Sequence, residues 1–394
     1  MEFIREKIKE KPIRKRRLAM KIGAIVGVVI AGVVCLVLAI LIGGENEPTE
    51  VLGTTATETE QSPVIPPDFN LSINDYQTLQ NELYQIGNIA NKSIVTVTHM
   101  ESENDWMTND YEAEGQGSGV IISEDGNYLY ILTERKIIEA AAHIRVSFID
   151  GTGAEATLLK YDGNTGMAVL TIEKRQLKPA TKRAIAIAKL GSEVPVENGA
   201  LAIALGSPLG TNFSILTGNI TSVENEVVTL DNNYSVFTTD IAATEQASGV
   251  LINTSGEVIG IVMQSFKGSQ NASTLTAVHY AEVEQIVESL KNRKDIPFVG
   301  VYISTVTEDI SEDYNIPKGV YIREVAMDSP AMKAGLQSGD VITHINGEVI
   351  VSDEKFSEMV RQLIPGTTCE ITVKRQNGNE YYEVDATVTI GVLE

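Results

Sequence analysis

Few side chains in this sequence of 394 residues are suited to carrying out a reaction. The two cysteines, Cys35 and Cys369, stand in very different surroundings, which excludes a disulfide framework and a cysteine-based zinc site. We expect no metal and no cofactor. A hydroxyl nucleophile would need an imidazole to take its proton and a carboxylate to orient that imidazole. The histidines that the chain offers for this role are His99, His143, His279 and His344.

Charge is distributed unevenly along the chain. The whole sequence has 31 basic and 53 acidic residues, a formal net charge of −22. Residues 1–21 hold nine of the basic residues and three of the acidic ones, which leaves 22 basic and 50 acidic residues in the remainder. A body this acidic repels phosphate backbones, so nucleic-acid binding by the main part of the chain is excluded.

One segment has the length and composition of a membrane helix. Residues 22–42 are 21 residues without a charge, long enough to cross the roughly 30 Å of a bilayer core. No small-residue cleavage site follows this run, which favours a retained anchor over a cleaved signal peptide. The basic residues 1–21 predict a cytoplasmic N-terminus. We therefore predict a single-pass protein of the cell membrane, with residues 44–394 on its outer face.

The rest of the chain divides into a spacer and two folded units. Residues 43–74 are rich in Thr, Glu and Pro, which predicts a disordered, acidic linker. Residues 75–294 begin with a predicted helix capped by Asp75 and running to about Ala90. Many short alternating runs follow, and these predict an all-β sandwich or a pair of barrels. Residues 295–394 form the second unit.

The second unit carries the most specific motifs. It contains the string FVGV at Phe298–Val301 and a longer string, GVYIREVAMDSPAMKAGLQSGDVITHINGEVI, at 319–350. Ser329-Pro330-Ala331 opens a short helix with Pro at its first position, Ser352-Asp353 caps a second helix, and Asn346-Gly347 is typical of a tight hairpin turn. These strings resemble the PDZ domain, an α+β fold, of proteases of the HtrA/DegP type.

This resemblance implies a binding site for extended or C-terminal peptides. In the family a peptide adds as a strand beside a helix, and backbone N–H groups of the FVGV-like loop hold its carboxylate. Gly300 would let the main chain approach that carboxylate closely. By resemblance, the site residues are Phe298, Val299, Gly300 and Val301 of the loop, and Phe356, Met359 and Val360 of the helix.

The first unit resembles the protease domain of the same family. The similar segments are GQGSGVIISEDG at 115–126, LAIALGSPLG at 201–210, ILTGNITSVE at 215–224, and the stretch 238–261. The resemblance implies a trypsin-like double β-barrel and the activity of a serine endopeptidase. It also implies three positions for the catalytic side chains, and each can be read in this sequence.

Two of these positions have lost their chemistry. The family's histidine lies in a string like LTNNHVV, where this chain has LTERKII and places Lys136. The family's carboxylate lies in a string like TDIAVL, where this chain has TGMAVL and places Gly166. The base and the residue that orients it are therefore both absent.

The nucleophile position is ambiguous because this stretch, DIAATEQASGVLIN at 240–253, is one residue shorter than in the family. Counting forward from Asp240 places the nucleophile at Ser248, and counting backward from Asn253 places it at Ala247. The glycine that donates an oxyanion-hole N–H is replaced by Glu245 or Gln246. Losing one such donor costs about 2.7–4 kcal/mol of transition-state stabilisation.

The leading hypothesis is a membrane-anchored, HtrA-like pseudoprotease whose PDZ domain binds peptides. The alternative is an active serine endopeptidase in protein quality control that uses Ser248 with Lys136, since Ser-Lys pairs exist on other folds. A third reading is an assembly partner, either a homo-oligomer or a hetero-oligomer with an active homologue. Family members often trimerise through the N-terminal part of the protease domain, here roughly residues 75–95.

Overall fold

The computed structural model describes residues 71–100, 115–139, 141–268, 273–378 and 380–393. The predicted cytoplasmic tail, the predicted membrane span at 22–42 and nearly all of the predicted linker lie outside these residues. None of the helices within the described ranges combines the length and the apolar character needed to cross a bilayer.

The described chain begins with helix α2 (Ile73–Ala90). The prediction that Asp75 caps this helix is wrong, because the N-cap is Ser72 and Asp75 is the third helical residue. The two form a capping box, in which each side chain accepts the backbone N–H of the other. The helix therefore starts inside the segment 43–74 that was assigned to the linker.

The first barrel is a closed six-stranded sheet in which every neighbouring pair is antiparallel. Its elements are η1 (Asn91–Ser93), β1 (Ile94–Met100), β2 (Gln116–Glu124), β3 (Tyr128–Glu134), α3 (Arg135–Ile138), β4 (His143–Ser147), β5 (Gly153–Tyr161) and β6 (Met167–Glu173). The order around the barrel is β1-β2-β3-β6-β5-β4. Strand β6 is buried on both faces, since its inner side chains fill the barrel while Met167 and Val169 join the core between the barrels.

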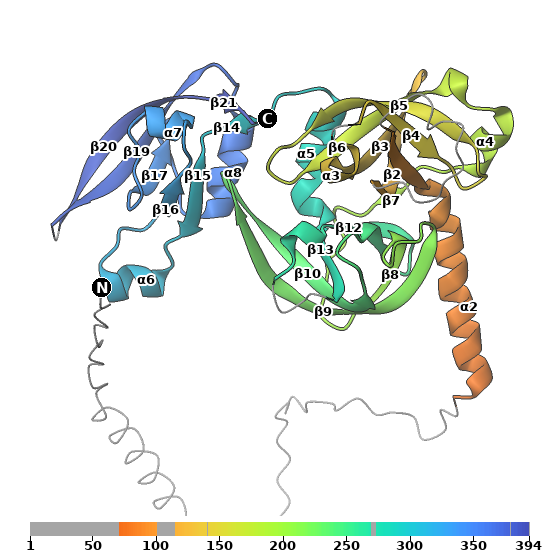
Figure 1. Ribbon diagram of the computed structural model, residues 1–394. Helices are drawn as coiled ribbons and strands as arrows, with labels where there is room; N and C mark the ends of the chain where they lie inside the picture. The colour runs from red at the N-terminus through yellow and green to blue at the C-terminus, as the bar shows by residue number, and fades with distance from the viewer. Residues whose placement is uncertain (1–70, 101–114, 140, 269–272, 379, 394) are drawn as a thin grey trace, which may run out of the picture. The chain divides into compact units, whose positions relative to one another are not determined.

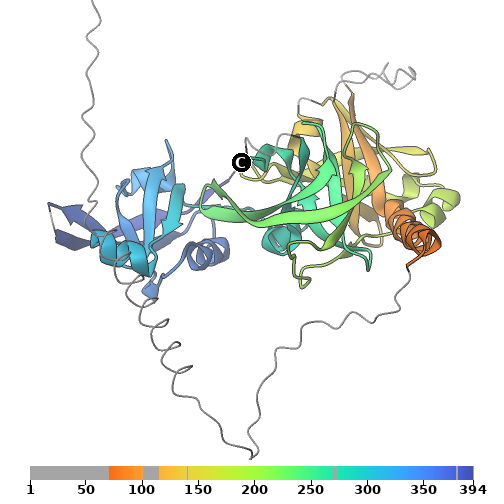
Figure 2. The same ribbon diagram turned by 90° about the horizontal axis from the view of Figure 1, so that it is seen from below.

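The second barrel is a seven-stranded sheet in the order β11-β8-β9-β10-β13-β12-β7, and pairing of β11 with β12 closes it. Its elements are η3 (Lys174–Gln176), α4 (Pro179–Ala184), β7 (Lys189–Leu190), β8 (Leu201–Ser207), β9 (Ser214–Thr229), β10 (Asn232–Ala242), β11 (Ser248–Ile252), β12 (Glu257–Val262), η4 (Gln264–Phe266) and β13 (Thr274–His279). Strands β9 and β10 have 16 and 11 residues, so their hairpin extends past the barrel to contact the C-terminal domain (Figure 2).

Helix α5 (Tyr280–Lys291) holds the two barrels together. It contacts β5 and β6 of the first barrel and β12 and β13 of the second (Figure 1). Its apolar face includes Val283, Val287 and Leu290, which are all at most 1% exposed. The predicted pair of β-barrels is therefore confirmed, and a short amphipathic helix closes it.

The C-terminal domain is a small sheet covered by helices, as a PDZ fold predicts. Its sheet has the order β15-β16-β17-β19-β20, with β18 paired to β17, and β14 pairs with β21. The elements are β14 (Pro297–Phe298), β15 (Val301–Thr305), α6 (Glu308–Tyr314), β16 (Val320–Val325), α7 (Pro330–Lys333), β17 (Val341–Ile345), β18 (Glu348–Val349), α8 (Asp353–Gln362), β19 (Thr368–Asn377), β20 (Glu380–Thr389) and β21 (Gly391–Val392). Strand β15 is an edge strand, which leaves one side of it open to further pairing.

Local predictions in this domain are confirmed. Ser329 and Ser352 cap α7 and α8 through their hydroxyl groups. Asn346 and Gly347 both have positive φ, 49° and 80°, which is the backbone of a tight hairpin turn between β17 and β18. Cys369 is 3% exposed in the core of the domain, and burial raises the pKa of its thiol to about 11.

Gly300 should tolerate a side chain far less well than Gly347. Both have positive φ, 94° and 80°, so alanine at either position should cost about 1–2 kcal/mol of backbone strain. Only at Gly300 would the new Cβ also collide with its surroundings, 2.4 Å from Cβ of Ser329, whereas Gly347 faces open space. We expect urea unfolding to show a larger loss of stability for Gly300→Ala than for Gly347→Ala. Equal losses would contradict this account of the loop.

Candidate functional site

The structure brings the three triad positions of the protease fold to the junction of the two barrels. The N–H of Arg135 on α3 donates to the carbonyl of Gly166 in the β5–β6 loop, at 2.7 Å. The N–H of Ser118 on β2 of the first barrel donates to Oγ of Ser248 on β11 of the second, at 2.9 Å. The positions that the resemblance assigns to the triad thus lie on elements that contact one another.

The Ser248 hydroxyl is sealed inside the protein. Ser248 is 2% exposed, and its Oγ accepts the N–H of Ser118. A Cβ atom built on Gly117 would lie 2.2 Å from Cδ1 of Ile137 and 3.2 Å from Oγ of Ser248. The side chains of Ile137 and Ser248 therefore both lie next to Gly117. The α3 residue beside the hydroxyl is therefore Ile137, which cannot accept a proton. Sequence reasoning singled out Lys136 and missed its neighbour.

Lys136 is occupied by a different partner. Its Nζ lies 2.7 Å from Oε2 of Glu134, whose side chain is 8% exposed. Burial raises the pKa of Glu134, and the ammonium of Lys136 opposes this shift. Within the described residues, Oε1 of Glu134 has no hydrogen-bond partner. Lys136 thus compensates a buried carboxylate, and no hydrogen bond between Lys136 and Ser248 occurs in the described part of the chain.

Gly166 leaves the orienting carboxylate without a substitute. Its φ of 76° places it in a turn, where its N–H donates to the carbonyl of Asp162 at 2.9 Å. The buried carboxylate of Asp162 accepts the N–H groups of Asn164 and Thr165 and the hydroxyl of Thr165. Burial raises the pKa of Asp162 against these hydrogen bonds. The oxygens of Asp162 accept hydrogen bonds from residues of their own loop and do not orient a base.

The alternative nucleophile position, Ala247, is a fully buried methyl group. Its backbone N–H donates to the carbonyl of Thr244, at 3.2 Å, within the turn that precedes β11. Nε2 of the buried Gln264 donates to the same carbonyl. Glu245, in this turn, is exposed and ion-paired with Lys267. The N–H that would stabilise an oxyanion at Ala247 is therefore already used within the turn.

The histidines named from the sequence have other surroundings. His143 pairs with Glu155 at 3.2 Å, across β4 and β5, and both side chains are exposed. His279 contacts a backbone carbonyl, and His344 contacts a threonine hydroxyl of its own strand. His99 lies on β1, opposite Ile144. In the described part of the chain, these hydrogen bonds of His143, His279 and His344 do not reach Ser248.

The predicted peptide loop holds a carboxylate that belongs to this chain. Asp231 lies in the turn between β9 and β10, with φ of 57°, and is 7% exposed. Its Oδ2 accepts the N–H of Val299 at 2.7 Å, and its Oδ1 accepts the N–H of Val301 at 2.9 Å. Both oxygens accept the N–H of Gly300 at 2.9 Å. Three consecutive backbone donors thus converge on one side-chain carboxylate.

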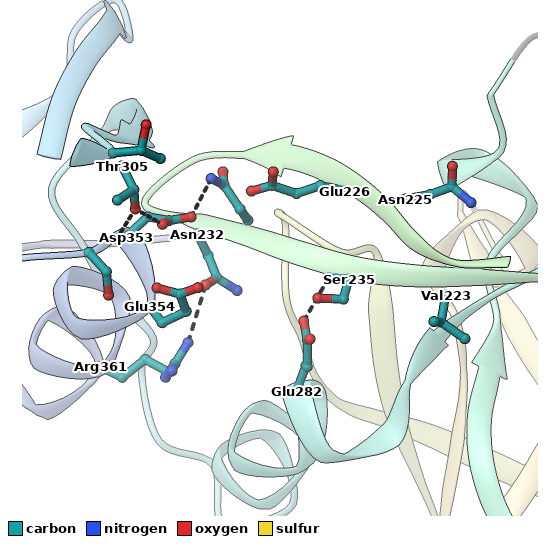
Figure 3. A pocket seen from close by; sticks show the side chains of 13 residues that line it. Val223, Asn225, Glu226, Asn232, Ser235, Glu282, Thr305, Asp353, Glu354 and Arg361 are labelled. Atoms are coloured by element: carbon teal, nitrogen blue, oxygen red, sulfur yellow. Dashed lines mark hydrogen bonds between the residues drawn. The ribbon is translucent and has the colours of Figure 1, made fainter. Parts of the chain in front are cut away.

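Residues beside Asp231 extend this contact to α8 (Figure 3). The hydroxyl of Ser357 donates to the carbonyl of Asp231 at 2.7 Å. The amide of Asn233 donates to the carboxylate of Asp353 at 2.6 Å, and the hydroxyl of Thr305 donates to the same carboxylate. Sequence reasoning missed Asp231 altogether, because the string Asp-Asn-Asn indicates only a turn.

The predicted helix residues of the peptide site belong mostly to the domain core. Phe356 is 0% exposed and Val360 is 2% exposed, while Met359 is half-buried at the edge of the same cluster. A charge at Phe356 would therefore disrupt the fold as well as any groove. Phe298 is half-buried, and the loop residues on either side of Gly300 are fully buried.

A polar cleft of about 660 Å³ adjoins this contact (Figure 3). Carboxylates from β9, α5 and α8 line it, and Arg361 is its basic member. Burial and the nearby charge of Asp353 raise the pKa of Glu226 in this cleft. Among the described residues no group of His, Cys, Asp or Glu side chains is arranged to hold a metal ion.

Asp231 should make stability depend on pH. Burial raises its pKa from 3.8 to about 6, because desolvation outweighs its hydrogen bonds to the loop. Between these two values the folded protein holds a proton that the unfolded chain has lost, so stability should fall as the pH rises through this window. We expect wild type to lose stability relative to Asp231→Asn between about pH 4 and about pH 6, with little further change above. Urea unfolding midpoints of both proteins across this range measure the effect, and a difference that is independent of pH would contradict it.

Two family models match the chain. A trypsin-like peptidase domain matches residues 117–261, and a PDZ domain matches residues 287–386. These matches fall on the two barrels and on the C-terminal domain, respectively.

Curated relatives share this pairing of domains in part of their length. A probable periplasmic serine endoprotease DegP-like of Pseudomonas savastanoi pv. phaseolicola is 32% identical over 288 residues, covering 72% of this chain and 57% of that protein. The serine protease Do-like HtrA of Bacillus subtilis is 32% identical over 286 residues, covering 68% of this chain and 62% of that protein. The chain thus spans about three fifths of the length of the curated relatives it matches.

Solved structures show the same fold. The HtrA-type protease AlgW with decapeptide is 23% identical, with a TM-score of 0.57, and covers 79% of this chain and 98% of that chain. The serine endoprotease from Yersinia pestis is 21% identical, with a TM-score of 0.53, and covers 80% and 98%. The double barrel, the C-terminal domain and the curated relatives agree, and the chain belongs to the HtrA family of trypsin-like proteins with a C-terminal PDZ domain.

Proposed function

We propose that this HtrA-family protein has lost peptidase activity and acts by binding peptide C-termini through its PDZ domain. The observation that carries the proposal is the environment of Ser248. Its hydroxyl is buried, accepts the N–H of Ser118 and is crowded by Ile137. A hydroxyl becomes a nucleophile only if a neighbouring base removes its proton, and no side chain described beside it can do so.

The size of the rate loss expected from these replacements supports the loss of peptidase activity. Removal of triad members leaves a rate about 10³–10⁴-fold above that in water, and this remaining activity depends on an intact oxyanion hole. Here the base and the orienting carboxylate are replaced by Lys136 and Gly166, and the N–H of Ala247 is used by Thr244. Each change acts on a different part of the mechanism, so restoring one would not restore the others.

The peptide-binding half of the proposal rests on the loop at 298–301. Its three N–H groups already hold a carboxylate group in the geometry that a peptide C-terminus requires. The edge of β15 beside it can accept an added strand. A solved neighbour of this fold is described as bound to a decapeptide.

We further propose that the ectodomain works outside the cytoplasm, anchored by residues 22–42. The uncharged run of 21 residues and the basic segment before it support the anchor. A curated relative is named as periplasmic, which supports the location.

An activity-based probe tests the loss of peptidase function. We expect a fluorophosphonate to leave the full chain unlabelled under conditions that label trypsin completely, because the Ser248 hydroxyl is neither exposed nor activated. Gel fluorescence after incubation measures this, with Ser248→Ala as the background control. Labelling that disappears in Ser248→Ala would overturn the proposal.

The same assay addresses the second candidate, an active serine endopeptidase with a Ser248–Lys136 pair. The names of the curated relatives, which are serine endoproteases, favour this candidate. Lys136→Arg is the informative variant, because arginine keeps the ion pair with Glu134 but cannot give up its proton. Lys182→Arg, at an exposed position, is the control. Labelling and casein turnover that persist in Lys182→Arg and disappear in Lys136→Arg would establish this mechanism.

We also propose self-association through α2, as a homo-oligomer or with an active homologue. Several large apolar side chains on and before this helix are exposed: Leu71, Ile73, Tyr76, Leu79, Tyr84 and Ile89. Clustered exposed apolar residues mark interaction surfaces.

We expect the detergent-solubilised full chain to have a mass above that of one chain, measured by light scattering. The double variant Leu79→Ser with Ile89→Ser should lower this mass, because it removes apolar area that association would bury. Exposed Leu201→Ser, on β8 of the second barrel, is the matched control. A monomeric full chain would rule out the homo-oligomer.

A further inference from the structure

The turn between β9 and β10 imitates a peptide ligand of the PDZ domain. A PDZ ligand makes two kinds of contact: its carboxylate accepts loop N–H groups, and its main chain pairs with an edge strand. The Asp231 carboxylate makes the first contact with three consecutive donors, Val299 to Val301, at 2.7 to 2.9 Å. A side chain of this chain therefore occupies the position that a peptide C-terminus would take.

The second kind of contact is present at one residue, and a side-chain amide makes the next contact along the edge. The N–H of Asp231 donates to the carbonyl of Val301 at 2.8 Å, and the amide of Asn233 lies 3.4 Å from the carbonyl of Ile303. Val301 and Ile303 are alternate residues of β15, and their carbonyls face its unpaired edge, where an added strand would bind. The turn thus covers both the carboxylate loop and the start of the pairing edge.

Helix α8 fixes the other side of the turn. Ser357 donates to the carbonyl of Asp231 at 2.7 Å, Arg361 donates to the side chain of Asn232 at 3.5 Å, and Asn233 donates to Asp353 at 2.6 Å. Ser357 is 2% exposed and Asp353 is 9% exposed, so these contacts are largely shielded from water. Asp231 of the turn and the first two residues of β10 are therefore each held by the PDZ domain.

We propose that residues 231–233 are an internal ligand of the PDZ domain, which a peptide C-terminus must displace in order to bind. The inference rests on the proposed peptide-binding function. One set of three N–H groups cannot hold two carboxylates, so peptide and turn exclude each other. Peptide binding then frees the β9–β10 hairpin of the second barrel from the C-terminal domain.

The covalent connection between Asp231 and the PDZ domain determines how strongly the turn competes with a free peptide. A group joined to its site by a short connection acts at an effective concentration on the order of millimolar. The affinity of the free peptide is reduced by the fraction of molecules in which the site is open. We expect removal of the internal carboxylate to raise peptide affinity at least about 10-fold.

A titration of the full chain with a fluorescent peptide tests the proposal. The peptide has an apolar C-terminal residue with a free carboxylate, and a C-terminally amidated copy serves as the ligand control. Fluorescence anisotropy gives the dissociation constant for wild type, Asp231→Asn and Asp231→Ala. Asp240→Asn is the matched protein control, because Asp240 also accepts a backbone N–H within the second barrel but does not contact the PDZ domain. Asn233→Ala removes the tie to Asp353 without touching the loop donors.

We expect both Asp231 variants to bind the free-carboxylate peptide at least about 10-fold more tightly than wild type, and Asn233→Ala to shift affinity the same way by less. Asp240→Asn should match wild type, and amidation should weaken binding to every protein. Equal affinity of wild type and the Asp231 variants would overturn the internal ligand while leaving the peptide site intact.

Failure of the peptide site itself would look different. Lack of binding by every variant, including Asp231→Ala, would contradict the proposed function and the competition with it. Amide hydrogen exchange at Val299, Gly300 and Val301 separates the two cases without peptide. Faster exchange of these amides in Asp231→Ala than in Asp240→Asn shows that the turn covers the loop, and unchanged exchange overturns the internal ligand.

Discussion

The carboxylate of Asp231, buried against three backbone N–H groups, is a central contact between the barrel domain and the PDZ domain. Burying a charged group costs several kcal/mol unless hydrogen bonds replace its water. Val299, Gly300 and Val301 supply those hydrogen bonds because the positive φ of Gly300 turns three successive donors toward one point. The remaining cost of burial appears in the pKa of Asp231, which rises to about 6.

The protease fold does not depend on the side chains that would carry out catalysis, because different groups hold the barrels together. The barrels are held by strand pairing and by buried apolar side chains, and the helix α5 packs against both of them. None of these interactions needs a histidine at position 136 or an aspartate at position 166. Around Ser248, the hydroxyl accepts the N–H of Ser118, and Ile137 lies close to it.

The PDZ domain keeps every local feature that its chemistry needs. Its loop donors are present, Gly300 has the backbone conformation that only glycine adopts easily, and β15 is the edge strand of its sheet. A loop that binds a carboxylate, in a chain whose Ser248 hydroxyl is buried, is the basis of the proposed role in recognition. The contact with Asp231 further links recognition to the β9–β10 hairpin, which is part of the second barrel.

Much of this protein could be predicted from its sequence because the signals were local. The caps at Ser329 and Ser352, the turn at Asn346-Gly347 and the alternation of the strands each depend on residues a few positions apart. The replacements Lys136 and Gly166 were also readable, since the strings around them fix their places on α3 and before β6. The start of α2 was misplaced by a few residues, because Ser72 and Asp75 both have side chains that favour a cap.

Only the tertiary structure decided which groups meet. Asp231 and its loop donors are 68 to 70 residues apart, and the donors are backbone N–H groups, which nearly every residue possesses. No residue type therefore marks the contact in advance. The same holds for Ser248, whose partner Ser118 is 130 residues away. The sequence by itself determined the fold of the two domains and the residue types at positions 136 and 166, because both follow from local strings. Long-range packing decided that the Ser248 hydroxyl is buried and that the Asp231 carboxylate lies in the loop at 298–301.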